Sequence, residues 1–169
     1  MVKMNRLLAI VFLVVVSCSV VMADGLKAGT SIEVLKGNEY QDQFDKPQSI
    51  HGDTRTLILT FEKGTGGCVN DFLSKQDKDY LSRHKIQYIA DISGMPGLVV
   101  SMFALPKMKK YPYIILLNYE DDFQEKVPHE KGKVTLISLD EKQNVVSTVF
   151  VEKQEAALES ALAVAPTAQ

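Results

Sequence analysis

One cysteine, Cys68, is the residue of this chain best suited to chemistry. It follows a glycine-rich segment, residues 63–67 (Lys-Gly-Thr-Gly-Gly), which leaves an apolar run at residues 57–61. Glycine at three of four successive positions lets a backbone bend sharply. We therefore predict a turn between a strand and a helix that begins near Cys68. The unpaired N–H groups and the dipole at a helix N-terminus favour a thiolate.

The first 23 residues have the pattern of a secretory signal. Lys3 and Arg6 form a basic start, residues 7–16 are uninterruptedly apolar, and small residues lead up to Ala23. The pattern predicts cleavage after Ala23 and a periplasmic or secreted protein. The apolar stretch is shorter than the ~20 residues that a membrane-spanning helix needs.

A second processing route is open at Cys18. Residues 15–18 (Val-Val-Ser-Cys) are similar to the lipobox of bacterial lipoproteins, although Val15 stands where leucine is preferred. That route would leave Cys18 lipidated and hold the protein at a membrane, and only then do we expect a membrane partner. We favour plain secretion because the signal has all its parts. Both routes lead out of the cytoplasm.

Charge and cysteine count narrow the function classes. Cleavage after Ala23 leaves 146 residues with 17 basic and 21 acidic side chains, and the longest basic run is Lys109-Lys110. A nucleic-acid partner would need a clustered positive face, so we exclude one. A lone cysteine, Cys68, cannot form an intramolecular disulfide, and the fold must rest on an apolar core that a chain of this length can bury.

Metal and cofactor sites are not indicated by the remaining residues. His51, His84 and His129 are far apart, and no Cys or His pair has the spacing of metal ligands. The acidic run at residues 120–122 is typical of a solvated loop. The glycines of residues 64–67 are not followed by the lysine of a phosphate-binding loop, so we expect no cofactor.

The order of predicted elements indicates one α/β domain. We expect an N-terminal turn and hairpin extension (residues 24–52), a domain over residues 53–163 and a frayed tail (residues 164–169). Within the extension we predict a strand at residues 32–35 and a hairpin at 40–47. We expect Pro106 to end or kink the helix that carries Met102, and we expect Met102 and Met108 to fill the core and not to serve as ligands. The domain's elements are predicted strands at 56–61, 86–92, 113–117, 134–139 and 145–151, and helices at 68–81 (broken at 74–79, with Asp77 capping the second piece), 97–105 and 152–163.

This pattern resembles the thioredoxin-like superfamily. The shared features are a glycine turn after the first core strand, a proline (Pro112) directly before a later buried strand, and a terminal hairpin followed by a helix. The resemblance implies a central mixed sheet, built from parallel βαβ units and a C-terminal antiparallel hairpin and flanked by helices. It also implies a cis peptide bond before Pro112. Residues 42–46 resemble the hairpin that precedes the core strand of secreted thiol-disulfide reductases and peroxiredoxins, and residues 91–96 resemble an element of uncharacterised periplasmic thioredoxin-like proteins.

The chain departs from the family's redox pattern. Thioredoxins carry C-x-x-C, whose two sulfurs act in turn, whereas these four positions read Thr65-Gly66-Gly67-Cys68. Dithiol exchange within one molecule is therefore excluded. The T-x-x-C spacing is similar to that of peroxiredoxins, but Phe61 stands where those enzymes have a proline, and neither Arg55 nor Arg83 matches their arginine.

Two functions follow from the resemblance and its departures. The first is a non-catalytic binding or accessory protein of the cell envelope, which presents Gly66, Gly67, Tyr111 and Pro112 to an unknown protein or small molecule. The second is a single-cysteine thiol peroxidase or thiol-transfer enzyme, in which Cys68 reacts, Thr65 helps to hold the substrate and an external thiol resets the enzyme.

Overall fold

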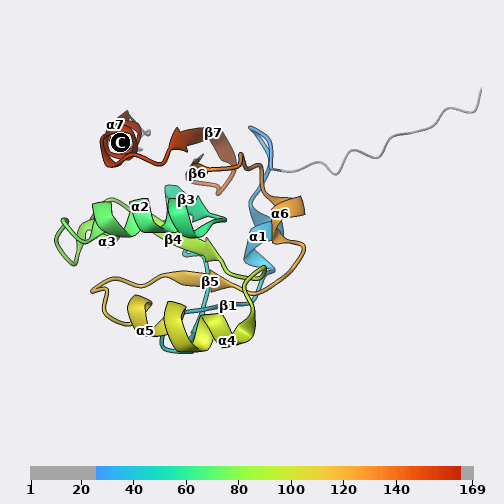
Figure 1. The fold of residues 1–169 in the computed structure, drawn as a ribbon. Coiled ribbons are helices and arrows are strands. Elements are labelled where there is room, and N and C mark those ends of the chain that lie inside the picture. The colour runs from blue at the N-terminus through green and yellow to red at the C-terminus, as the bar shows by residue number, and fades with distance from the viewer. Residues whose placement is uncertain (1–25, 165–169) are drawn as a thin grey trace, which may run out of the picture.

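The computed structural model describes residues 26–164, which form a single seven-stranded sheet with helices on both faces (Figure 1). The strand order is β2-β1-β5-β4-β3-β6-β7. The strands are β1 (Tyr40–Gln41), β2 (Pro47–Gln48), β3 (Thr56–Thr60), β4 (Ile86–Asp91), β5 (Leu116–Asn118), β6 (Lys133–Leu139) and β7 (Val145–Glu152). The helices are α1 (Glu33–Lys36), α2 (Lys63–Leu73), α3 (Tyr80–Arg83), α4 (Gly97–Val99), the π-helix η1 (Val100–Ala104), α5 (Leu105–Met108), α6 (Phe123–Lys126) and α7 (Glu155–Val164).

The sheet is mixed. β3 pairs in parallel with β4, and β4 pairs in parallel with β5. β6 runs antiparallel to β3 and forms a hairpin with β7, while β1 runs antiparallel to β5. The central strands β3 and β4 are buried along their whole length, as strands covered on both faces must be. The predicted fold class, α/β with parallel units and a terminal antiparallel hairpin, is confirmed.

Two apolar cores lie on the two faces of the sheet. Ile58 of β3 packs with Val69 and Phe72 of α2 and with Leu158 of α7. The neighbouring residue Leu57 faces the opposite core, which α1 and α6 cover. This alternation follows from the two-residue period of a strand. Because α2 and α7 share one core, they are also in contact with each other.

The glycine-rich segment is helical, and the predicted turn there is wrong. α2 begins at Lys63, five residues before Cys68, and includes the glycines at positions 64, 66 and 67. A reciprocal cap closes its first turn: the Glu62 N–H donates to the Thr65 hydroxyl at 3.3 Å, and the Glu62 side chain accepts from the Thr65 backbone N–H. Burial of one helix face outweighs the low helix propensity of glycine.

Residues 32–35 form a helix and not the predicted strand. Ile32 and Leu35 are fully buried at a spacing of three residues, which places them on one face of α1. On the other face, Lys36 pairs with Glu33 at 2.9 Å. The hairpin predicted over residues 40–47 is present as β1 and β2.

The helix expected at residues 97–105 is longer and differently wound. It runs from α4 through η1 into α5, and the Leu105 N–H donates to the Val100 carbonyl, five residues back. Pro106 lies in the first turn of α5 and has no N–H to give to the preceding turn, so the wider π-turn absorbs the lost bond. The core position predicted for Met102 is wrong, because its side chain is 58% exposed. Met108 does pack against the core.

The predicted cis bond before Pro112 is also wrong. Within residues 26–164 no peptide bond is cis. Pro112 lies in a bend, and β5 begins only at Leu116, so the proline stands apart from the strand that it was expected to start. The trans isomer is the lower in energy for an X–Pro bond.

The expected signal segment, the possible lipidation at Cys18 and the tail beyond Val164 lie outside the described residues. Elsewhere the remaining strands and the C-terminal helix occur where predicted. The break between α2 and α3 is also present, but the predicted cap by Asp77 is wrong, because the N-cap residue of α3 is Asp79. The Asp77 carboxylate instead accepts from the Asp79 N–H at 3.0 Å, in the turn before the helix.

The helical state of the glycine segment can be tested by substitution. No atom lies within 4 Å of a Cβ built at Gly67. We expect Gly67→Ala to raise the free energy of unfolding by about 0.5–1 kcal/mol, because alanine is the better helix former. Gly132 is the matched control, because its φ of 77° is strained for any other residue, and Gly132→Ala should destabilise by about 1 kcal/mol. Urea denaturation measures both, and a destabilised Gly67→Ala variant would contradict the helical assignment.

Candidate functional site

A cavity of about 460 Å³ lies between α2, the carboxyl end of β4 and the segment α4–η1–α5. Its walls are mainly apolar. Apolar side chains on the walls include Ala90, Ile92, Met95, Val99, Phe103 and Met108. Two lysines, Lys63 and Lys107, and the carboxylates of Glu62 and Asp91 also border it.

Uncharged polar groups form one wall of this cavity. The Tyr88 hydroxyl is 3.1 Å from the Thr60 hydroxyl, on the neighbouring strand. A Cβ built at Gly66 would lie 3.5 Å from the Tyr88 hydroxyl, so the absence of a side chain there leaves the space open. Burial raises the pKa of Tyr88. This wall therefore offers neutral hydrogen-bonding groups to whatever fills the cavity.

Asn70 of α2 also borders the cavity and is fixed by a second tyrosine. Its side-chain oxygen accepts from the Tyr113 hydroxyl at 3.1 Å. Tyr113 in turn stacks on Tyr111, with ring centroids 5.3 Å apart. Because Tyr111 is itself a wall residue, the stack links the bend before β5 to α2.

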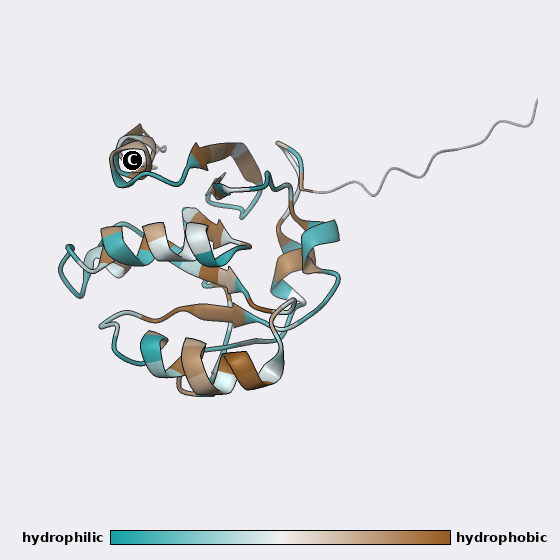
Figure 2. Ribbon diagram, viewed as in Figure 1, coloured by the Kyte–Doolittle hydropathy of each residue, from teal (hydrophilic) through white to brown (hydrophobic). Residues whose placement is uncertain are grey.

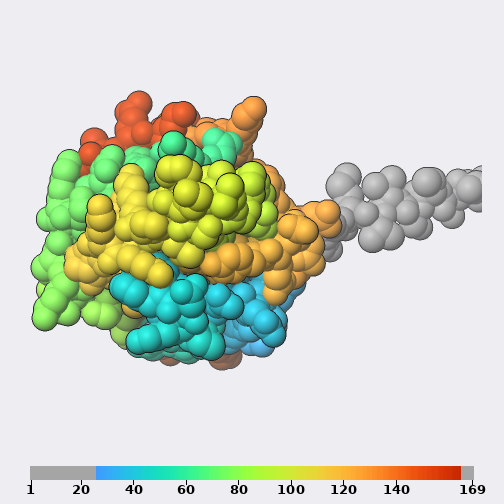
Figure 3. Space-filling model, turned by 60° about the horizontal axis from the view of Figure 1, so that its bottom comes forward, coloured from blue at the N-terminus to red at the C-terminus, as the bar shows by residue number. Residues whose placement is uncertain are grey.

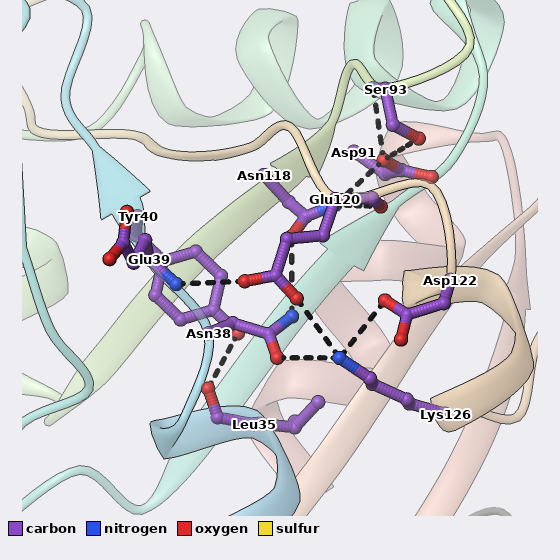
Figure 4. Close-up of polar contacts among 10 residues, drawn as sticks. All are labelled: Leu35, Asn38, Glu39, Tyr40, Asp91, Ser93, Asn118, Glu120, Asp122 and Lys126. Atoms are coloured by element: carbon purple, nitrogen blue, oxygen red, sulfur yellow. Dashed lines mark hydrogen bonds and ion pairs between the residues drawn. The ribbon is translucent and has the colours of Figure 1, made fainter.

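The Asp91 carboxylate is buried and already satisfied (Figure 4). It accepts from the Ser93 hydroxyl at 2.8 Å and from the Asn118 side chain at 3.1 Å. Gln124 of α6 donates to its other oxygen at 2.9 Å. Several hydrogen-bond donors can stabilise the negative charge of a buried carboxylate without a neighbouring cation. Asp91 therefore ties β4, β5 and α6 together.

A charged group, the Lys126 ammonium, lies at the opposite end of this network from Asp91 (Figure 4). The Lys126 ammonium lies 2.9 Å from Glu120 and 3.0 Å from Asp122 and donates to the Asn38 side chain at 3.0 Å. Burial opposes the charge of Lys126, but the bonds to these two carboxylates prevail and raise its pKa. The network holds the loop after β5 against α1 and α6.

Cys68 lies in the second turn of α2, away from the helix N-terminus. Its side chain is 9% exposed. The sulfur-bearing residue borders a shallow hollow with Lys63, Gly64, Asp71, Lys153 and Glu155. Burial raises the pKa of the thiol, and the charges of Glu155 and Asp71 raise it further. The expected shift toward a thiolate is therefore reversed, because α2 begins at Lys63 and two acids are close to the sulfur.

The structure separates the six residues predicted for the site. Gly66, Gly67 and Tyr111 border the cavity. Cys68 borders the other hollow, and Gly67 is common to both. Thr65 is fully buried and its hydroxyl is used in the cap of α2, while Pro112 is exposed and borders neither space. Their roles in binding or catalysis stay predictions.

Three solved structures show which fold this arrangement belongs to. An uncharacterized thioredoxin-like protein from Porphyromonas gingivalis has a TM-score of 0.51 and 14% identity, covering 79% of this chain and 92% of that one. The peroxidoxin BcpB of Mycobacterium tuberculosis has a TM-score of 0.54 and 16% identity over 85% and 99%. A thio-disulfide isomerase from Thermus thermophilus has a TM-score of 0.50 and 17% identity over 83% and 97%. No family model and no curated protein matches the sequence.

The chain has a thioredoxin-like fold. Identities this low establish the fold alone. In this thioredoxin-like chain, the first helix after the central strand β3 carries both Gly66 and Cys68, and it turns them toward different surroundings. Within residues 26–164, no group of three His, Cys, Asp or Glu side chains is placed to hold a metal.

Sequence reasoning missed most of the residues that border the cavity. Thr60, Tyr88 and Asn70 were not singled out, although a threonine and a tyrosine at buried positions of adjacent predicted strands suggest a hydrogen-bonded pair. The exposed part of the segment α4–η1–α5 was also missed, because its Met102 was assigned to the core.

The state of the thiol can be measured by alkylation. With a raised pKa and little exposure, Cys68 should react with iodoacetamide at pH 8 roughly tenfold more slowly than free cysteine. Glu155→Gln removes the nearer negative influence and should speed the reaction about twofold, whereas Glu159→Gln on the same helix should have no effect. A fast reaction with a midpoint below ~8.5, the value of a free thiol, would contradict this description.

Proposed function

We propose that this protein is an extracytoplasmic thioredoxin-fold binding or accessory protein of the cell envelope, without dithiol activity. It binds an apolar group, either a small molecule or a side chain of a partner protein, in the cavity between α2 and α4–η1–α5. The location outside the cytoplasm rests on the signal pattern of residues 1–23.

The composition of the cavity is the observation that carries this proposal. Its volume of about 460 Å³ lies within the ~300–1,000 Å³ of small-molecule sites, which are mostly apolar with few polar groups. On one wall of the cavity the polar groups are neutral: the hydroxyls of Thr60 and Tyr88 and the side chain of Asn70. Two lysines and two carboxylates border the cavity elsewhere. The neutral groups can orient an apolar ligand.

The same geometry weighs against the single-cysteine enzyme. Cys68 does not border the cavity, and its pKa is raised when a nucleophilic thiol needs a lowered one. The Thr65 hydroxyl, which would hold the substrate, is engaged with Glu62. An oxidant or a disulfide substrate would have to approach the sulfur through the hollow that Lys153 and Glu155 border.

Filling the cavity from within α2 tests the proposal. Gly66→Leu should place its side chain in the cavity and weaken binding of the neutral fluorescent probe Nile red by about tenfold, the equivalent of ~1.4 kcal/mol. Gly64→Leu is the matched control, because a Cβ there meets only the flexible end of Lys153, at 3.8 Å. Fluorescence titration measures both affinities.

The thiol gives a second control in the same titration. Cys68→Ser should leave the Nile red affinity unchanged, since the sulfur does not border the cavity. Equal affinities for Gly66→Leu and wild type, or a loss of binding in Cys68→Ser, would contradict the proposal.

A further inference from the structure

The segment α4–η1–α5 is apolar on its outer side as well as on the side that packs against the sheet. Four residues form what we call the apolar stripe: Leu98, Val99, Met102 and Phe103, which are 70%, 43%, 58% and 67% exposed. Val100, on the inner side, is 6% exposed. A surface helix normally has one polar face, and contiguous exposed apolar groups on a soluble protein mark an interaction site.

The π-turn brings the stripe together. In a π-helix the hydrogen bonds join residues five apart, so residues four and five positions apart stand over one another. Leu98 is therefore followed along the segment by Met102 and Phe103, and the same line continues toward Lys107. Figure 2 shows the segment coloured hydrophobic at α4 and hydrophilic at the end of α5, and Figure 3 shows the segment forming a broad part of one face of the molecule.

The charged side chains of the chain stretch that carries the stripe have one sign. Residues 92–119 contain no aspartate or glutamate and three lysines, Lys107, Lys109 and Lys110. The rest of the chain after Ala23 has 14 basic and 21 acidic residues. Lys109 is 3.6 Å from Asp45, while Lys107 and Lys110 are in no ion pair with another residue of the described range 26–164. A positive, apolar surface thus stands out on a negative protein.

We propose that this surface docks on an anionic lipid bilayer. Helices that lie in a membrane interface combine bulky apolar side chains, which enter the acyl boundary, with lysines, which meet the anionic headgroups. Leu98, Met102 and Phe103 supply the bulky apolar side chains, and the three lysines supply the positive charge. The docking depends neither on lipidation at Cys18 nor on a ligand in the cavity. None of the helices in residues 26–164 is long and apolar enough to cross a membrane, so the contact is peripheral.

A second copy of the chain fits this surface less well. A two-fold contact places the same patch on both partners, so the lysines of one copy would face the lysines of the other. An anionic bilayer has the opposite charge and no fixed shape to match. The cavity is bordered by three residues of this exposed surface, Val99, Phe103 and Lys107. Docking therefore places one side of the cavity next to the lipid.

Vesicle sedimentation tests the proposal with the exported, purified protein. Wild type should bind vesicles of equal parts phosphatidylcholine and phosphatidylglycerol at least tenfold more strongly than vesicles of phosphatidylcholine alone, and added salt should weaken the binding. The double variant Leu98→Ser/Met102→Ser should bind at least tenfold more weakly, and neither residue borders the cavity. Lys109→Gln and Lys110→Gln should each weaken binding about fivefold, the equivalent of ~1 kcal/mol per lysine near the surface.

Matched variants on another face control for general loss of apolar groups or charge. Val146 and Val149 of β7 are each 47% exposed, and Val146→Ser/Val149→Ser should bind vesicles like wild type, as should Lys142→Gln. All variants carry the same N-terminus, so any contribution of the N-terminus to vesicle binding is the same in each. Thermal melting checks that each variant is folded. Equal binding to both vesicle types, equal binding of the stripe variant and wild type, or a dimer in sedimentation equilibrium that the stripe variant dissociates would each overturn the proposal.

Discussion

The packing of helix α2 on strands β3 and β4 is the constraint on which the rest of the structure depends. Its cap, formed by Glu62 and Thr65, starts the helix at Lys63, and burial of Val69 and Phe72 holds it on the sheet. A helix that starts there carries Gly66 past the Tyr88 hydroxyl with no side chain between. The open space that results is the cavity. The same start moves Cys68 into the second turn, beyond the unpaired N–H groups that would favour a thiolate.

The two sides of α2 therefore have different chemistry. Toward the segment α4–η1–α5 lies a mainly apolar space with neutral hydroxyl and amide groups on one wall and charged side chains elsewhere on its border, which suits reversible binding. Toward α7 lies a thiol that burial and the acids Glu155 and Asp71 keep protonated. In this chain with a thioredoxin-like fold, helix α2 thus separates an open space from the thiol of Cys68. The exposed stripe and the lysines that follow it form the face for which we propose contact with a lipid surface.

The sequence predicted the sheet well, because buried strands are continuous apolar runs bounded by turn residues, as at Thr56–Thr60 and Ile86–Asp91. It predicted the site less well, for physical reasons. Local propensity at Gly64, Gly66 and Gly67 favours a turn, and only the burial of the following residues makes the segment helical. Residues 98–103 are nearly all apolar, so the sequence predicts burial on every side of this helical segment. The sequence alone does not show which side has no other element packed against it. The cis bond before Pro112 was implied by family resemblance and by no residue of this chain.

A ¹H–¹⁵N correlation spectrum recorded during a Nile red titration tests most directly whether ligand and thiol occupy different sides of α2. We expect chemical-shift changes at Gly66, Ala90 and Ala104, which border the cavity, and none at Gly64, Lys153 and Glu155, which border the hollow beside Cys68. Changes concentrated at Gly64, Lys153 and Glu155, with Ala90 and Ala104 unmoved, would contradict this expectation.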